Sequence, residues 1–131
     1  MGVWGAGSFE NDDALDWIWE LETSADFALL DTSLDAVLNA SPGEMGASDW
    51  AVALAAAEIV AALGGRPEGG LPEEAESWVA GKSTPPASLT VKARAAVAAA
   101  SADSELRDLW EEARDLETWR ASVAELEGRL G

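Results

Sequence analysis

Residues 50–63 constrain the fold more than any other segment, because they are apolar on nearly every side of a helix and carry one charge, Glu58. Ser48 or Asp49 offers a helix N-cap before them, and Gly64-Gly65 offers a stop after them. A helix that is apolar all round is stable only when other elements surround it. The segment is too short to span a bilayer. It is therefore predicted to form a buried, central helix.

The rest of the chain repeats the spacing of amphipathic helices. Asn11 is a good N-cap, and apolar residues follow it at helical intervals. The pattern predicts helices at about residues 12–22, 24–39, 49–63, 72–80, 86–102, 104–114 and 115–130. No run of strand length alternates between apolar and polar residues, and no fixed-period repeat is visible. We expect an all-α, compact bundle of six or seven helices, a single domain over residues 1–131 with an irregular Gly/Trp lead-in.

Two missing residue types exclude several kinds of active site. The chain contains no cysteine and no histidine. Thiolate nucleophiles, disulfides, zinc–cysteine sites, Ser-His-Asp triads and histidine-ligated metals are therefore excluded. Neither a Walker sequence nor a Gly-x-Gly-x-x-Gly followed by a ribose-binding acid is present. The sequence thus predicts no catalytic residue, no cofactor and no metal site.

The net charge of −17 limits the partners that the chain can bind. It has too few cations to displace counterions from nucleic-acid phosphates, and an anionic membrane surface would repel it. The N-terminus carries no Lys or Arg ahead of an apolar run, unlike a signal peptide. We expect a cytoplasmic protein without membrane binding or direct nucleic-acid phosphate binding. No oligomeric state is predicted.

The charge is distributed unevenly along the chain. Residues 1–65 contain twelve Asp/Glu and no Lys/Arg, whereas residues 66–131 contain thirteen Asp/Glu and all eight Lys/Arg. Two interpretations are open. Either the downstream cations fold back to pair with the acidic half, or the acidic half faces a partner.

The opening residues resemble the start of a family of small bacterial proteins catalogued as a domain of unknown function, number four-two-five-nine. The motif is Met-Gly-x-Trp-Gly-x-Gly-x-Phe-x-Asn-Asp-x-Ala-x-Asp-Trp, over residues 1–17. Similar segments recur at residues 55–58, 63–67, 71–73, 77–79, 104–106, 109–112 and 119–120. The resemblance implies a bacterial, helical, single-domain protein with no established activity or cofactor. Trp19 departs from it, because a smaller or polar residue is expected there.

The Gly/Trp opening has two interpretations. Glycines let a backbone approach a phosphate, and the helix N-terminus after Asn11 attracts anions. However, Asp12 and Asp13 already place negative charge at that helix start. The structural interpretation is that Trp4 and Phe9 pack against the core and so attach the lead-in to it.

Asp12, Asp16 and Glu20 lie at i, i+4 and i+8 and form one acidic stripe on the first predicted helix, with Asp13 beside it. Each like-charge pair costs roughly 0.2–0.5 kcal/mol on an exposed helix. The stripe is either a solvated face, a divalent-cation site or the partner of a downstream arginine, the candidates being Arg107, Arg114 and Arg120.

Glu58, inside the central helix, also has two interpretations. A buried carboxylate is a candidate general acid or base. The structural alternative places it at the edge of the core, paired with an arginine or an indole N–H. If the chain is an enzyme or a small-ligand binder, Glu58 and Asp16 are the carboxylates that it would use.

Seven tryptophans are many for a chain of 131 residues, and a tryptophan marks either a core or a binding surface. Trp19 shares a helix face with Leu15, beside the acidic stripe. It is either an exposed anchor or an extension of the core. The tryptophans that fall on predicted inward faces are Trp17, Trp50, Trp78, Trp110 and Trp119.

Three functional hypotheses follow. The first is a non-enzymatic interaction protein whose acidic half binds a basic protein partner, with toxin immunity and nucleic-acid mimicry as special cases. The second is a carboxylate-based enzyme, or a binder of a small ligand or divalent cation. In the third, the acidity only maintains solubility in the host. The residues singled out as interaction or structural candidates are Trp4, Phe9, Asn11, Asp12, Asp16, Trp17, Trp19, Glu20 and Glu58.

Overall fold

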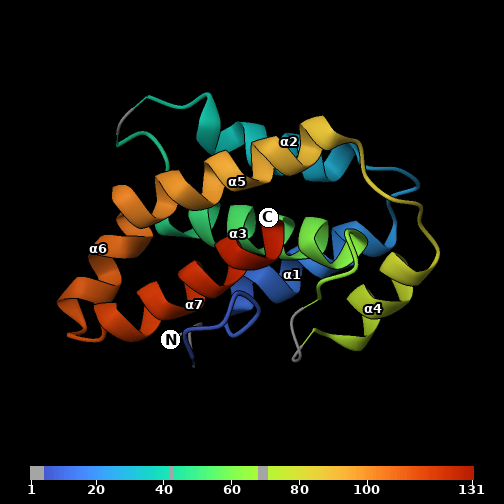
Figure 1. Ribbon diagram of the computed structural model, residues 1–131. Coiled ribbons are helices and arrows are strands. Elements are labelled where there is room, and N and C mark those ends of the chain that lie inside the picture. The colour runs from blue at the N-terminus through green and yellow to red at the C-terminus, as the bar shows by residue number, and fades with distance from the viewer. Residues whose placement is uncertain (1–4, 42, 68–70) are drawn as a thin grey trace.

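The computed structural model describes residues 5–41, 43–67 and 71–131, which form α-helices and no β-strand, as predicted. Short turns connect the helices, and Figure 1 shows their order in space. The described residues contain seven helices: α1 (Asp12–Glu22), α2 (Ala28–Leu38), α3 (Ala47–Leu63), α4 (Glu73–Ala80), α5 (Ala87–Ala102), α6 (Glu105–Glu112) and α7 (Leu116–Leu130).

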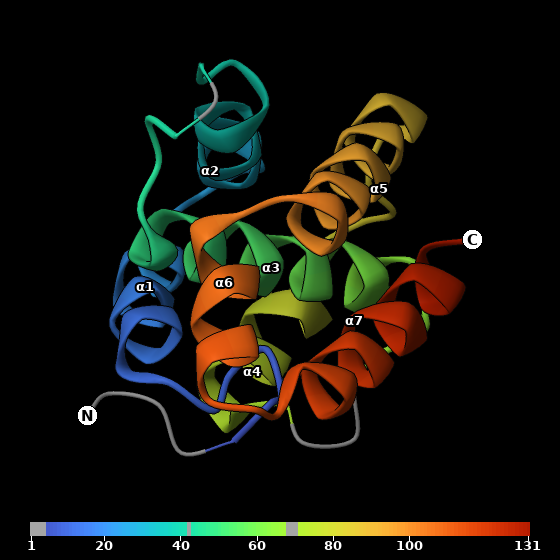
Figure 2. The same cartoon turned by 90° about the vertical axis from the view of Figure 1, so that its left-hand side faces the viewer.

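Helix α3 is the centre of the bundle, as its apolar sequence predicted. It contacts each of the other six helices. Figure 2 shows it in the middle, with α1, α2, α5 and α7 around it. Because neighbours surround α3, its apolar side chains are removed from water on every side.

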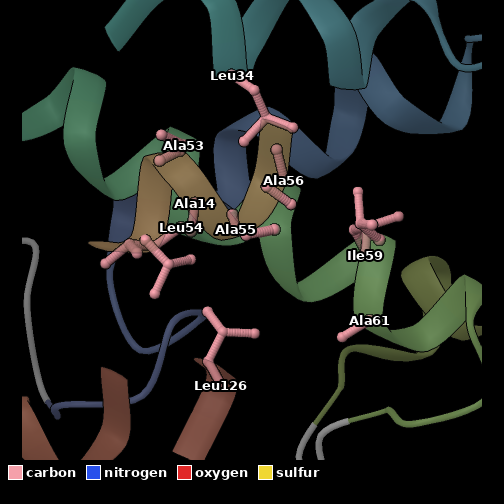
Figure 3. Close-up of a cluster of buried hydrophobic side chains, with 14 of the residues drawn as sticks. Ala14, Leu34, Ala53, Leu54, Ala55, Ala56, Ile59, Ala61 and Leu126 are labelled. Carbon is pink, nitrogen blue, oxygen red and sulfur yellow. The ribbon is translucent and has the colours of Figure 1, made fainter. Parts of the chain in front are cut away.

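Alanines of α3 let the surrounding helices approach closely. Figure 3 shows Ala53, Ala55 and Ala56 on α3, with Leu34 reaching in from α2 and Leu126 from α7. All five side chains are buried. A methyl group occupies little space, so leucines of facing helices fill the gap between the backbones. The apolar segment of the sequence therefore sets both the position of α3 and the spacing of the bundle.

Helix α2 begins at Ala28, four residues later than the predicted start at Ser24. Ser24 instead helps to end α1, since its backbone N–H donates to the Leu21 carbonyl at 3.0 Å. The Asp26 carboxylate accepts from the Ala28 N–H at 3.0 Å, which starts α2 with a local turn. Side-chain bonds to the backbone thus override the apolar pattern at this boundary.

Two further predicted boundaries are wrong. Helix α3 begins at Ala47, and Asp49 is not its N-cap but lies in the first turn, where its carboxylate accepts from the Gly46 N–H at 3.1 Å. Helix α6 ends at Glu112 instead of continuing to Arg114. Arg114 adopts a left-handed conformation with φ of 61°, which ends a helix.

Four of the five tryptophans predicted to face inward are buried. They are Trp17, Trp50, Trp78 and Trp119. The fifth, Trp110, is only half-buried and packs at the margin of the core. Across the described ranges, no helix combines the length and the apolar character needed to cross a membrane.

Candidate functional site

The inner face of α1 is fixed by two hydrogen bonds. Asn11 is the N-cap, as predicted, and its Oδ1 accepts from the Ala14 N–H at 2.8 Å. The Trp17 side chain is buried, and its Nε1 donates to Ser33 Oγ of α2 at 3.0 Å. These two bonds fix the rotation of α1 about its axis, so they also determine which way its outer face points.

The outer face of α1 carries Trp19 in the middle of carboxylates. Trp19 is 77% exposed, more than any other large hydrophobic side chain in the described part of the chain. Asp16 lies one turn before it and Glu22 one turn after it. We call the exposed residues Asp12, Asp16, Trp19, Glu20 and Glu22 the α1 acidic face. Of the two interpretations of Trp19, the structure shows the exposed one.

Helix α4 packs beside α1 and is held by Trp78. The Trp78 Nε1 donates to the Ser24 carbonyl at 2.9 Å, directly after the end of α1. Its ring meets Phe27 edge-on, with centroids 6.3 Å apart. Figure 1 shows α4 next to this end of α1. The exposed Glu73 and Glu74, in the first turn of α4, therefore add to the negative charge near α1.

A shallow, open groove lies between these two helices. It consists of two adjoining depressions of about 490 and 600 Å³, and Glu22 and Glu74 line both. Leu15, Ile18 and Trp19 give one end an apolar wall. We call this feature the α1–α4 groove; its lining is completed by Glu73, Ser77 and Trp78.

Some carboxylates of the acidic half, residues 1–65, form ion pairs with a cation from the other half of the chain. Lys92 of α5 lies 2.9 Å from Asp31 and 3.0 Å from Asp35, both on α2. Hydrogen bonds to these two carboxylates raise the pKa of Lys92 above its ordinary value. One downstream cation thus folds back onto α2, in agreement with one of the two charge interpretations.

Glu58 is paired in the same way. Its Oε1 lies 2.6 Å from Nη2 of Arg129 in α7, and its side chain is 1% exposed. Arg129 also binds Glu125 at 2.6 Å. Burial lowers the pKa of Arg129, but the hydrogen bonds and charges of Glu125 and Glu58 outweigh it, so the net pKa is raised. Of the two partners that the structural alternative allowed, the structure shows the arginine; Glu58 is deeply buried instead of lying at the edge of the core.

The two carboxylates of the enzyme hypothesis have opposite environments. Glu58 is buried against α7, whereas Asp16 is exposed on the outer face of α1. They therefore do not form the facing pair that glycosidase-type chemistry requires. Within the described ranges, no group of three or more acidic side chains is placed to hold a metal ion.

Where the structure describes the chain, the carboxylates of α1 are not paired with an arginine. Among the described residues, no ion pair involves α1. Arg107, one of the candidate partners, instead lies 3.3 Å from Glu111 on its own helix. Arg114 and Arg120 are exposed and take part in none of these ion pairs. In the part of the chain that the structure covers, the α1 acidic face is thus a solvated surface.

The Gly-rich opening holds a carboxylate of its own chain. Oε1 of Glu10 accepts from the Gly7 N–H at 2.9 Å, and a Cβ at Gly7 would lie 2.6 Å from that oxygen. Glycine at this position therefore leaves room for the carboxylate, which a Cβ would displace. Phe9 is buried in the core, as the structural interpretation requires, whereas Trp4 lies outside the described residues. Sequence reasoning missed Glu10, because nothing in its spacing marks it.

A cavity of about 190 Å³ lies under the opening, between the first turn of α3, α6 and α7. Its wall is largely apolar, with Leu54, Trp119 and Val123 among the lining residues. The charged group in this wall is Asp13, and it already accepts from Ser48 Oγ at 3.1 Å. This internal bond joins the starts of α1 and α3.

Comparison with known proteins identifies one family. The model of a family described as Domain of unknown function (DUF4259) matches residues 2–122, which include α1 to α6 and the first half of α7. The resemblance of the opening motif is therefore confirmed. No curated protein and no solved structure matches the chain.

Proposed function

We propose that this chain, which belongs to the DUF4259 family, is a non-enzymatic interaction protein that binds a basic protein partner through the α1 acidic face. Trp19 is the observation that carries the proposal. Its indole is 77% exposed between Asp16 and Glu22, on a helix whose inner face is already fixed. Exposed aromatic side chains of this kind are the usual anchors of protein interfaces.

The charge around Trp19 supports a basic partner. The α1 carboxylates repel one another, and in the described residues no cation pairs with them. A partner with Lys or Arg side chains would relieve this repulsion and would be steered toward the face before contact. Lys92 pairs with the carboxylates of α2, and Arg129 pairs with Glu58. Among the described residues, neither cation pairs with a carboxylate of α1.

Two special cases of the proposal are neutralisation of a toxin and mimicry of nucleic-acid charge. Both use a basic protein as the partner, and the identity of that protein separates them. We place the interaction in the bacterial cytoplasm; the absence of cysteine from the sequence fits this location.

Affinity capture with matched charge variants tests the proposal. The immobilised chain is exposed to a lysate of the source organism, and bound protein is eluted with salt. D16N/E20Q/E22Q removes three charges from the α1 acidic face, and E112Q/E117Q/E127Q removes three exposed charges from α6 and α7. We expect a basic protein whose affinity falls about tenfold with the first variant and less than about twofold with the second.

The same experiment separates the proposal from the solubility hypothesis. If the acidity only maintains solubility, the two triple variants will behave alike. Equal retention by both variants, or capture of an acidic protein alone, would contradict the proposal.

A further inference from the structure

We propose that the α1–α4 groove takes an arginine side chain of the partner, with its guanidinium on the Trp19 indole and between Glu22 and Glu74. This inference rests on the proposed function and specifies the group that the acidic face recognises. It commits to one occupant, an arginine-containing segment of a basic protein.

The walls of the groove match the two parts of an arginine side chain. Leu15 is half-buried and Trp19 is exposed, so these two side chains offer an apolar surface for the methylene stem; Ile18, also in the lining, is buried. Glu22 and Glu74 come from different helices and line both depressions of the groove. Carboxylates on two helices are suited to a planar fork with several N–H donors.

The carboxylates that line the groove are exposed to solvent. In the described part of the chain, no ion pair involves Glu22, Glu73 or Glu74. The nearby Lys82 places its Nζ 4.7 Å from the centroid of the Trp78 ring instead. The protein therefore already holds one cation near Trp78, the indole that lines the other depression of the groove.

Arginine fits this groove better than lysine. A guanidinium is planar and weakly hydrated, stacks on an aromatic face and can bond two carboxylates at once. An ammonium is a strongly hydrated point charge and gains less from the indole face. The combination of indole, apolar wall and paired carboxylates thus predicts selection between two side chains of equal charge.

Titration with two peptides, followed by NMR, tests the inference. The ¹⁵N-labelled protein is titrated with hexa-arginine and with hexa-lysine at low salt, and the indole N–H signals are recorded. Trp19→Phe identifies the signal of Trp19 by its loss. We expect hexa-arginine to shift this signal and to bind about fivefold more tightly than hexa-lysine.

Matched variants locate the binding. E22Q/E74Q is expected to weaken hexa-arginine about tenfold and to abolish the preference over hexa-lysine, whereas E112Q/E117Q leaves both unchanged. Circular dichroism confirms that each variant is folded. If both peptides shift the Trp19 signal with equal affinity, the arginine inference is overturned and the proposed function stands. If neither peptide shifts that signal, or if E112Q/E117Q weakens binding as much, both are overturned.

Discussion

Trp17 and Trp19 are two residues apart on α1, and their side chains are 2% and 77% exposed. Two steps along a helix turn the direction by roughly 200°, so one indole enters the core and the other faces water. The buried indole is bonded to Ser33 of α2 at 3.0 Å. The same residue type therefore holds the helix in place at one position and is exposed to water at the other, where we propose the binding surface.

Arg129→Ala is expected to destabilise the protein. It removes the arginine that lies 2.6 Å from the buried Glu58 carboxylate, and loss of one partner from a buried pair costs about 3 kcal/mol. Urea unfolding followed by circular dichroism measures this change. Glu125→Gln is the control, because Glu125 is exposed and its bond to Arg129 is worth less than about 1 kcal/mol. Equal unfolding free energies for the two variants would show that the Glu58 pair does not hold α7 to α3.

Gly7→Ala is expected to cost about 1 kcal/mol, because its Cβ would displace the Glu10 carboxylate and break the bond to the Gly7 N–H. In a Glu10→Ala background the same substitution should cost less, since no carboxylate is there to be displaced. Unfolding free energies of the two single variants and the double variant give the coupling. Strictly additive costs would mean that Glu10 is not the reason for glycine at this position.

The pairing of Lys92 predicts a loss of stability at alkaline pH. Its pKa is raised in the folded state by hydrogen bonds to Asp31 and Asp35. A raised folded pKa gives stability that is fully present below the unfolded pKa of about 10.4 and is lost as pH rises through the folded pKa. Unfolding curves from neutral to strongly alkaline pH should therefore fall more steeply for the wild type than for Lys92→Met. Parallel curves for the two proteins would rule out this contribution.

The sequence predicted the central helix and the N-cap of α1 because both depend on local pattern. Apolar residues on every side of α3 require burial wherever the other helices lie. Asn11 caps α1 through a bond to a residue three positions away. The pairing of Glu58 with an arginine was predictable for a similar reason, since a buried charge needs a partner.

The candidate site depends on distant contacts that a local pattern does not encode. The Ser24 carbonyl is held by Trp78, 54 residues away in sequence. The same contact places α4 beside α1 and so creates the groove. Trp19 lay at the margin of the apolar stripe, where only the position of the neighbouring helices decides between core and surface. The sequence predicted Asp12, Asp16, Trp19 and Glu20 of the α1 acidic face. It did not predict Glu22 or the contribution of Glu73 and Glu74.

The affinity of Trp19→Ala for the basic protein recovered by capture tests the central claim most directly. Its unfolding free energy should stay within about 0.5 kcal/mol of the wild type, because the side chain is 77% exposed. Isothermal titration should show binding weakened about thirtyfold, as expected for a hot spot of about 2 kcal/mol. An unchanged affinity, with or without a loss of stability, would contradict the assignment of the α1 acidic face as a binding surface.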